Sequence, residues 1–239
     1  MIDFHSHILP EMDDGSKSVE QTIEMLKMSY EQGVTDIVAT PHFYPASESP
    51  ERFFKKRQKS IDKLLDKCDF RDMPNVYVGA EVGYFEGIAG STYTKSLCTE
   101  GTDYILIEMP FEKWDLRTIK EICAIKNTGI NPIIAHVERY LVRHNEKLLK
   151  EFIYHDIMIQ SNADFFSGKS SKKKALKMLA QRTVKLLGTD SHNLDDRKPN
   201  MKGATDVIEK AFGDIAIEDI NSIGRWILKD AIKIQDLKS

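Results

Sequence analysis

The sequence has 239 residues, of which 41% are hydrophobic and 30% are charged, a balance typical of a globular protein with room for one large α/β domain. A net charge of −3 gives no electrostatic basis for nucleic-acid binding, and no apolar run reaches the roughly 18–20 residues of a membrane span. Three widely spaced cysteines and the lack of a signal-peptide pattern predict a single cytoplasmic domain over residues 1–239 that is not an integral membrane protein.

Short apolar segments alternate with amphipathic helical segments along the chain. The predicted strands lie at 2–4, 36–40, 76–78, 104–107, 132–135, 157–160 and 183–187. The predicted helices lie at 19–32 (after a Ser18 N-cap), 51–67, 115–128, 138–155 (in two pieces around His144 and Asn145), 203–212, 217–226 and 227–236. Residues 43–50 are predicted to form a loop, and the basic run from Lys169 to Lys174 a solvated loop that leads into a helix.

Every predicted strand except the sixth is followed by a histidine, aspartate or glutamate. His5 and His7 point the same way past the first strand, because alternate residues of an extended chain share a face. Asp14 comes from an acidic turn shortly afterwards. The complete set of candidate metal ligands is His5, His7, Asp14, His42, Glu81, Glu108, His136, Asp190 and His192.

The positions of these ligands also bear on the fold. Strands that alternate with helices form parallel βαβ units, which suit either a barrel or an open doubly wound sheet. A barrel brings the carboxyl ends of all its strands to one face, whereas an open sheet spreads them apart. We therefore predict an α/β fold of the distorted, seven-stranded TIM-like (β/α)7 barrel type.

So many carboxylates and imidazoles on one rim would be electrostatically costly without cations among them. Mixed nitrogen and oxygen ligands without cysteine fit Mn, Fe or Zn better than a structural zinc site. Nine ligands are too many for one ion, so the sequence indicates two or three ions. Such a cluster can bind the oxygens of a phosphate group during in-line displacement.

The ordered motifs resemble those of the PHP (polymerase and histidinol phosphatase) superfamily. They are His5-Ser6-His7, Asp13-Asp14-Gly15, Thr40-Pro41-His42, Gly79-Ala80-Glu81, His136-Val137-Glu138-Arg139-Tyr140 and Thr189-Asp190-Ser191-His192-Asn193. More closely, FHSHILPEMDDG and HVERY are similar to the bacterial protein-tyrosine phosphatases of capsule and exopolysaccharide gene clusters. The similarity covers essentially the whole chain. It implies a PHP fold and a trinuclear centre, often of Mn, with Fe, Zn, Co or Mg as alternatives.

The resemblance also implies which ligands share an ion. One ion would bind His5, His7, Glu81 and Asp190, and a second would bind Glu81, Glu108 and His136. The third would bind Asp14, His42 and His192. The implied chemistry is hydrolysis of a phosphate monoester by in-line attack of a metal-activated hydroxide, without a cysteinyl-phosphate.

Two arginines and several aromatic residues are candidates for substrate contact. Arg139, which matches the arginine of HVERY, and Arg197 would bind phosphoryl oxygens, although Arg139 could instead form a surface ion pair with Glu138 or Glu146. The side chains expected to form the wall beside a phosphotyrosine ring are Phe43, Tyr44, Tyr84 and Phe111, with Phe85 and Trp114 as further candidates.

By resemblance, the partner would be the phosphotyrosine tail of a bacterial tyrosine kinase that controls polysaccharide export. A histidinol-phosphate or other small-molecule phosphatase of the same superfamily is the nearest alternative. A nuclease is disfavoured by the net charge of −3. A metal-stabilised scaffold without enzyme activity is disfavoured by the open polar rim, because structural metal sites are usually closed.

Overall fold

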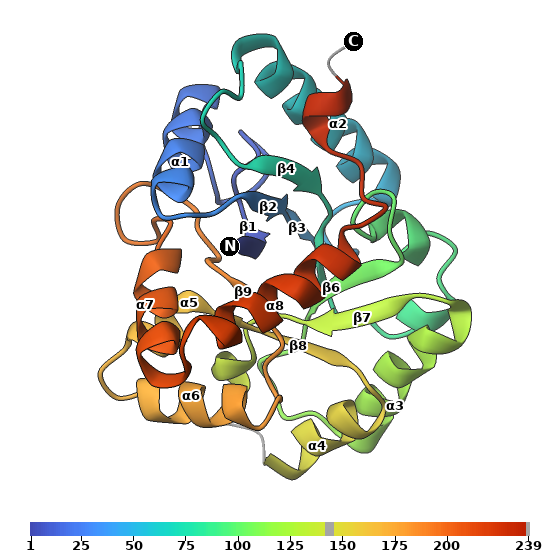
Figure 1. Ribbon diagram of the computed structural model, residues 1–239. Helices are drawn as coiled ribbons and strands as arrows, with labels where there is room; N and C mark the ends of the chain where they lie inside the picture. The colour runs from blue at the N-terminus through green and yellow to red at the C-terminus, as the bar shows by residue number, and fades with distance from the viewer. Residues whose placement is uncertain (142–145, 238–239) are drawn as a thin grey trace.

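The computed structural model describes residues 1–141 and 146–237, which form an α/β fold with a curled sheet (Figure 1). The strands are β1 (Ile2–Ser6), β2 (Asp36–Ala39), β3 (His42–Phe43), β4 (Asn75–Val78), β5 (Glu81–Gly83), β6 (Tyr104–Glu108), β7 (Asn131–Ile134), β8 (Met158–Asn162) and β9 (Leu186–Gly188). The α-helices are α1 (Val19–Glu31), α2 (Pro50–Lys67), α3 (Leu116–Ile125), α4 (Glu146–Tyr154), α5 (Ala163–Ser167), α6 (Lys172–Ala180), α7 (Met201–Phe212) and α8 (Asp214–Ile227). The 3-10 helices are η1 (Ile88–Gly90), η2 (Thr94–Leu97), η3 (Lys126–Thr128), η4 (Val137–Tyr140) and η5 (Ile234–Leu237).

The strands form two sheets in which neighbours run parallel, in the orders β1-β2-β4 and β3-β5-β6-β7-β8-β9. The predicted α/β class is therefore confirmed, but the count of seven strands is not. Two additional strands, β3 and β5, follow β2 and β4 after interruptions of two residues each. Pro41 lies in the first interruption and has no amide hydrogen to donate to a neighbouring strand.

The first and last strands lie side by side. The amide of Asp190 donates to the carbonyl of His5 at 2.7 Å, and the amide of His7 donates to the carbonyl of Ser191 at 2.8 Å. The buried carboxylate of Asp3 accepts hydrogen bonds from the amide and hydroxyl of Thr189 at 2.8 and 2.6 Å. These contacts join β1, at the edge of one sheet, to the segment after β9, at the edge of the other. Residues that are far apart in the sequence therefore meet at one rim.

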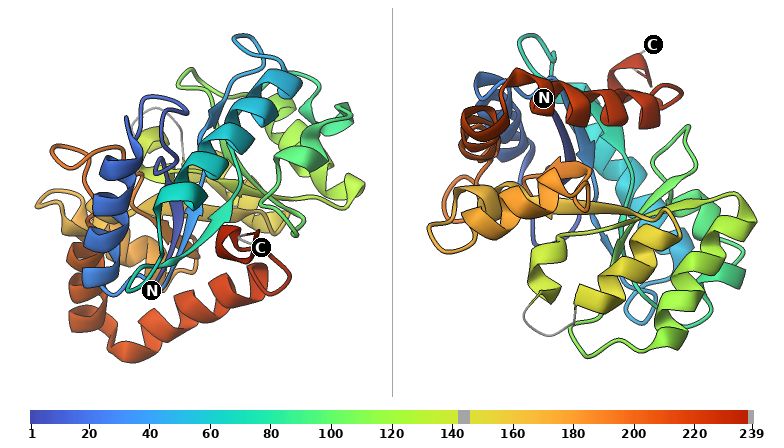
Figure 2. Two further views of the ribbon diagram at one scale, coloured as in Figure 1. Left: turned by 90° about the horizontal axis from the view of Figure 1, so that it is seen from above. Right: turned by 60° about the horizontal axis from the view of Figure 1, so that its bottom comes forward.

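Helices surround the strands, and α8 lies in front of them in the view of Figure 1. One apolar core lies between the strands and helices such as α1, α2 and α7, with Leu26, Phe53 and Ile208 among its buried residues. A second core joins Ile227 of α8 to Ile2 and other strand residues. Because α8 packs on the start of β1, it covers the face opposite the ends that carry the candidate ligands. Figure 2 shows the same arrangement from two other sides.

The chain after α8 differs from the prediction of a helix at 227–236. Its backbone groups bond to neighbouring segments instead: the amide of Ile232 donates to the carbonyl of Glu100, and Lys233 forms an antiparallel bridge with Tyr77. Gln235 also accepts a hydrogen bond from the amide of Val76 through its side chain. The segment becomes helical again only at η5. None of the helices in the described ranges is long and apolar enough to cross a membrane.

Other predicted helices are close to the observed ones, with local differences. The expected helix at 138–155 consists of η4 and then α4, and its expected break around His144 and Asn145 lies outside the described residues. The basic run ends inside α6, which begins at Lys172, as expected for a loop that leads into a helix. The short helix α5, which follows directly on β8 with Asn162 as its N-cap residue, was not predicted.

Candidate metal centre

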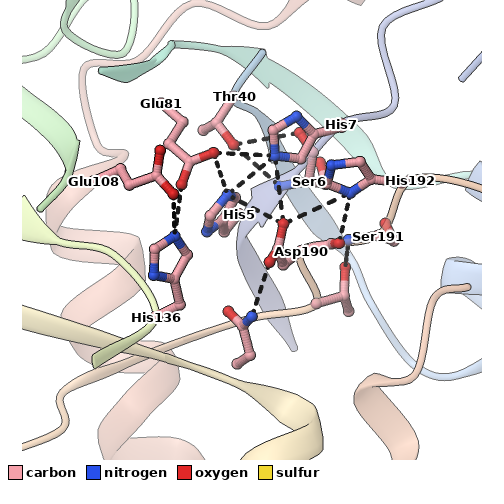
Figure 3. A network of polar contacts seen from close by, with 12 residues as sticks. His5, Ser6, His7, Thr40, Glu81, Glu108, His136, Asp190, Ser191 and His192 are labelled. Atoms are coloured by element: carbon pink, nitrogen blue, oxygen red, sulfur yellow. Dashed lines mark hydrogen bonds and ion pairs between the residues drawn. The ribbon is translucent and has the colours of Figure 1, made fainter. Parts of the chain in front are cut away.

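Figure 3 shows polar side chains from several strand ends converging on one place. His5 lies on β1 and His7 just past it, whereas His42 and Glu81 begin the short strands β3 and β5. Glu108 ends β6. His136 follows β7, Asp190 and His192 follow β9, and Asp14 lies in the turn after β1. All nine predicted ligands therefore come from the same rim of the sheet.

We call His5, His7, Glu81 and Asp190 the first group, because the two imidazoles each lie close to both carboxylates. His5 Nε2 lies 3.2 Å from His7 Nε2, 3.2 Å from Glu81 Oε2 and 3.5 Å from Asp190 Oδ1. His7 Nε2 lies 3.3 Å from Glu81 Oε2 and 3.4 Å from Asp190 Oδ1. Because His5 Nε2, His7 Nε2 and Glu81 Oε2 are separated by 3.2–3.3 Å, one ion can lie about 2.0–2.1 Å from all three, which is the usual metal–nitrogen distance for zinc and similar ions. The first group therefore fits a divalent cation.

Two further groups lie on either side. In the second group, His136 Nε2 lies 2.8 Å from Glu81 Oε1 and 3.5 Å from Glu108 Oε1. In the third group, Asp14 Oδ1 lies 3.5 Å from His42 Nε2 and 3.3 Å from His192 Nε2. These are the groups implied by the family resemblance. The distances also allow other combinations of ligands. His7 lies close enough to bind an ion together with the third group, and His42, Glu81 and Glu108 lie close enough together to bind one as a separate set.

Burial gives a second test of the fit to metal ions. His5, His7, Glu81, His136 and His192 are at most 1% exposed. Glu81 Oε2 and His192 Nε2 are buried without a hydrogen-bond partner of acceptable geometry among the described residues. A buried charged or polar atom without a partner is costly, and a coordinated cation removes that cost. The donor set and these two atoms both fit a divalent metal.

Hydrogen bonds at the opposite ring nitrogen orient several of the imidazoles. His7 Nδ1 lies 2.7 Å from Asp13 Oδ2, and His192 Nδ1 lies 2.8 Å from the carbonyl oxygen of Asp190. Both oxygens can only accept, so in each neutral histidine Nδ1 carries the hydrogen and the Nε2 lone pair faces the centre. His5 Nδ1 has a longer contact, 3.5 Å to Gln160 Oε1. Such partners fix the tautomer in which histidine binds a metal.

The pKa values of these groups depend strongly on their neighbours. Burial alone would raise the pKa of Glu81, but the imidazoles of His5, His136 and His42 hold it well below its usual range. Burial alone would lower the pKa of His136, but hydrogen bonds with Glu108 and Glu81 raise it to about 9. In contrast, burial and the nearby charges of His7 and Arg197 lower the pKa of His192 to about 4. The Glu81 carboxylate thus stays ionised and attracts positive charge.

Both predicted arginines reach the centre. Arg139 Nη2 lies 2.6 Å from Asp190 Oδ2, and Arg139 Nη1 lies 3.4 Å from Glu108 Oε1. Arg197 Nη2 lies 2.8 Å from Asp190 Oδ1. Glu138, the expected surface partner of Arg139, instead accepts hydrogen bonds from Ser161 and Asn162. Both guanidinium groups are about one third exposed, so they remain accessible to a ligand.

The predicted aromatic residues have different environments. Phe43 is fully buried and packs edge-on against Phe53, so the prediction that it contacts the substrate is wrong. Tyr44 lies at the centre, where its ring stacks on His42 with centroids 5.0 Å apart. The Tyr84 hydroxyl donates to Glu121 of α3 at 2.6 Å, away from the ligands. Phe111 is 48% exposed in the loop after β6.

The two additional aromatic candidates are also packing residues. Trp114 is 3% exposed and packs against Tyr140 with ring centroids 4.8 Å apart. Phe85 is partly buried and stacks with Tyr93 at 5.8 Å. Among the predicted aromatic residues, Tyr44 contacts the ligands and Phe111 is exposed, whereas the other four make packing contacts or bond elsewhere.

The prediction missed three polar residues that support the ligands. Asp13 accepts from His7 and also from the amides of His42 and Gly15, at 2.9 Å each. Gln160 Oε1 accepts from the amide of His136 at 2.7 Å. Asp3 joins β1 to the segment after β9. Asp13 lies beside Asp14 in the DDG motif and six residues after its partner His7, whereas Thr189, the partner of Asp3, lies 186 residues along the chain.

The backbone at two ligands is in an unusual conformation. His136 has φ of 30° and Asp190 has φ of 54°, both in the left-handed region that few residues other than glycine adopt. Such strain often accompanies functional sites, because the surrounding structure must stabilise it. Gly188 supports the same region by close contact: a Cβ atom there would lie 2.5 Å from His5 Cβ.

The sequence matches a known family over most of its length. A profile described as "Capsular polysaccharide synthesis, CpsB/CapC" covers residues 1–224. The chain belongs to the CpsB/CapC family. Within this family it is 34% identical over 224 residues to tyrosine-protein phosphatase CpsB of Streptococcus pneumoniae, covering 89% of this chain and 91% of that protein. It is 29% identical over 223 residues to tyrosine-protein phosphatase YwqE of Bacillus subtilis, covering 89% and 85%. The predicted family is thus confirmed.

Solved structures agree with this assignment to the CpsB/CapC family. One matching chain comes from the crystal structures of YwqE from Bacillus subtilis and CpsB from Streptococcus pneumoniae, described as unique metal-dependent tyrosine phosphatases. Its TM-score is 0.83 at 27% identity, and the match covers 97% of this chain and 96% of that one. Histidinol phosphate phosphatase from Lactococcus lactis matches with a TM-score of 0.56 at 16% identity, over 88% and 93%, and therefore shares the fold.

Proposed function

We propose that this chain is a metal-dependent protein-tyrosine phosphatase that acts on the phosphotyrosine tail of a bacterial tyrosine kinase controlling capsular or exopolysaccharide synthesis. The observation that carries the proposal is the first group, whose member Asp190 is contacted directly by both Arg139 and Arg197. The tyrosine-protein phosphatase names of relatives in the CpsB/CapC family support the substrate class.

The proposal includes two or three divalent ions, one in each of the ligand groups, with Mn as the native ion. Fe, Zn, Co or Mg are the alternatives. Imidazole and carboxylate ligands without cysteine support this choice. Divalent ions bound there would polarise phosphoryl oxygens and lower the pKa of water so that it can act as the nucleophile near neutral pH.

The protein's own side chains would orient and neutralise the phosphoryl group. Arg139 and Arg197 both contact Asp190, and a guanidinium group can bind two phosphoryl oxygens at once. In the reaction, a new bond forms between a water oxygen and phosphorus, the bond from phosphorus to the tyrosine oxygen breaks, and the phenol oxygen takes up a proton. Cys68, Cys98 and Cys123 belong to segments near α2, η2 and α3 and not to the ligand groups, which supports a route without a cysteinyl-phosphate.

Substrate contact and location are further parts of the proposal. Phe111, which is 48% exposed, is the best-placed aromatic residue for contact with a phosphotyrosine ring. An aromatic ring of this kind would stack on or pack beside the substrate ring. We place the enzyme in the cytoplasm, which its few, widely spaced cysteines favour.

The test combines metal analysis with hydrolysis of two substrates by the purified protein, with and without added Mn²⁺. The substrates are a phosphotyrosine peptide and histidinol phosphate. We expect two or three ions per chain and faster release of phosphate from the peptide. Bound metal without hydrolysis of either substrate would overturn the enzyme proposal.

The same experiment decides between the proposed function and its alternative. The shared fold with a histidinol phosphate phosphatase makes a small-molecule phosphatase the natural competitor. A clear preference for histidinol phosphate would support the same phosphate-ester hydrolysis, but with a small molecule in place of phosphotyrosine as the substrate. A protein that unfolds on removal of its metals, and hydrolyses neither substrate when they are restored, would instead be a metal-stabilised scaffold.

A further inference from the structure

Tyr44 makes contacts that a residue of the substrate wall would not need. Its hydroxyl donates a hydrogen bond to Glu108 Oε2 at 2.6 Å and lies 3.0 Å from His42 Nδ1. Its ring stacks on the His42 ring at an interplanar angle of 28°. His42 and Glu108 belong to different ligand groups, so one hydroxyl contacts both.

The directions of these hydrogen bonds determine the orientation of His42. A carboxylate only accepts, so the Tyr44 hydrogen points to Glu108 and the Tyr44 oxygen is left to accept from His42 Nδ1–H. The Nε2 lone pair of His42 then faces Asp14, whose Oδ1 lies 3.5 Å away. This is the orientation that the third group needs to bind an ion.

The carboxylate of Glu81 is a second acceptor near His42. Glu81 Oε2 lies 2.9 Å from His42 Nδ1 without a hydrogen bond of acceptable geometry, and that oxygen is also a ligand atom of the first group. If His42 bonded only to Glu81, the oxygen would be less available to an ion in the first group. The hydroxyl of Tyr44 offers His42 another acceptor and so leaves Glu81 Oε2 free to bind metal.

A close contact fixes the Tyr44 ring in this position. A Cβ atom on Gly83 would lie 2.4 Å from Cδ1 of Tyr44 and 2.7 Å from Cε1, so only glycine leaves room for the ring there. Gly83 belongs to β5, the strand that also carries Glu81 and pairs with β3 on one side and β6 on the other. The ring therefore lies over the strand between the two ligands that its hydroxyl contacts.

We propose that Tyr44 is a positioning residue of the metal centre, whose hydroxyl links His42 to Glu108 and thereby stabilises metal binding by the third group. This inference rests on the metal centre of the proposed function but not on its substrate. It assigns Tyr44 a role toward the ligands in place of the expected role in the substrate wall.

The test begins with protein from which a chelator has removed the metals. Mn²⁺ and Co²⁺ are titrated back, and binding is measured by calorimetry and, for Co²⁺, by its visible absorption spectrum. Tyr44→Phe removes only the hydroxyl. We expect it to lose one equivalent of metal, or to bind that equivalent about 10–100-fold more weakly, as is usual when the partner of a ligating histidine is removed. Unchanged stoichiometry, affinity and Co²⁺ spectrum would overturn the proposal.

Tyr77→Phe is the matched control. It also removes a hydroxyl that donates to a carboxylate, that of Asp36 at 3.2 Å, but on β4 and away from the ligands. We expect metal binding by this control to equal that of the unmodified protein. A loss of metal in both variants, with equal thermal stability, would mean that the effect is not specific to Tyr44 and would also overturn the inference.

A second variant tests the position of the ring without removing the hydroxyl. Gly83→Ala should displace the Tyr44 ring and weaken binding of the same equivalent that Tyr44→Phe weakens. Normal metal binding by Gly83→Ala in a folded protein would contradict this part of the argument. Because every measurement is of metal binding, a protein that binds metals normally but does not hydrolyse phosphotyrosine overturns the proposed function and leaves this inference intact.

Discussion

At the scale of single residues, the centre depends on which nitrogen of each histidine faces inward. His7 and His192 present Nε2 because Asp13 and the carbonyl of Asp190 accept from Nδ1. A motif such as HxH gives the position of a histidine but says nothing about its tautomer. The acceptor that fixes the tautomer is therefore as important for metal binding as the ligand itself.

Asp13→Asn tests that principle at one residue. The amide can turn its NH₂ group toward His7 Nδ1 and favour the tautomer whose Nε2 carries hydrogen and cannot bind metal. We expect metal affinity to fall by about 10–100-fold while the fold is retained. Equilibrium titration of the stripped protein measures the change, and Asp62→Asn, on the exposed side of α2, is the control. Equal affinities for the two variants would contradict the role given to Asp13.

Arg139→Ala tests a residue expected to contact the phosphoryl group. Loss of one donor to a developing oxyanion costs about 10²–10³ in rate, so kcat on a phosphotyrosine peptide should fall by that factor. The control is Arg182→Ala, because Arg182 is highly exposed and forms an ion pair with Asp219 at 3.6 Å. If kcat is the same in both variants, the Arg139 contacts with Asp190 and Glu108 serve only to neutralise charge.

At the scale of secondary structure, the sequence predicted well those strands whose apolar run directly precedes a ligand. The strands β3 and β5 were not predicted because two or three residues give no periodic signal. Because β3 was not predicted, the burial of Phe43 was not predicted either. In an extended strand His42 and Phe43 point to opposite faces, so a ligand at one position places its neighbour in the core.

The C-terminal helix was predicted wrongly for a related reason. Local periodicity favoured a helix at 227–236, but the amide of Ile232 and the side chain of Gln235 bond to distant parts of the chain. Asp3 and Gln160 were missed as supporting residues because their partners lie on other strand ends, 186 and 24 residues away in the sequence. Sequence patterns report local preference, whereas these positions are determined by tertiary contacts.

Gly188→Ala tests how closely the first and last strands pack. The added Cβ would lie 2.5 Å from His5 Cβ and 2.9 Å from His5 N, so one strand must move. We expect the free energy of unfolding to fall by about 1–3 kcal/mol, as for other overpacked cores. Denaturant unfolding measures the change.

Gly203→Ala provides the control for this prediction. Its added Cβ on α7 would lie 3.4 Å from the nearest atom, and replacing a helical glycine by alanine should stabilise the protein by about 0.5–1 kcal/mol. Destabilisation of Gly203→Ala as large as that of Gly188→Ala would show that the close approach to β1 is not the cause.

At the scale of the whole molecule, the rim concentrates titratable groups, so stability should depend on pH. Because the pKa of His136 is raised from its usual value of about 6.5 to about 9, protonation stabilises the folded, metal-stripped protein. That contribution is complete below about pH 6.5 and is lost as the pH rises through about 9. We expect the Tm of stripped protein to fall across this range.

Metal-loaded protein provides the comparison for the pH prediction. A bound ion needs neutral imidazole, so protonation no longer stabilises the folded state, and binding itself adds stability according to ligand concentration and affinity. The Tm of loaded protein should therefore be higher and fall less between pH 6.5 and 9. A stripped protein whose Tm stays constant over that interval would contradict the prediction.

The contact between β1 and the segment after β9 has a consequence for biosynthesis. Asp3 and Thr189 are 186 residues apart in the sequence, and His5 and Asp190 are two and one residues beyond them, respectively. Since a ribosome releases the chain from its N-terminus, His5 and His7 are exposed long before Asp190 and His192 exist. The complete first group can therefore bind its ion only after Asp190 has been synthesised. A metal ion that binds then would join two segments of the chain that were synthesised far apart in time.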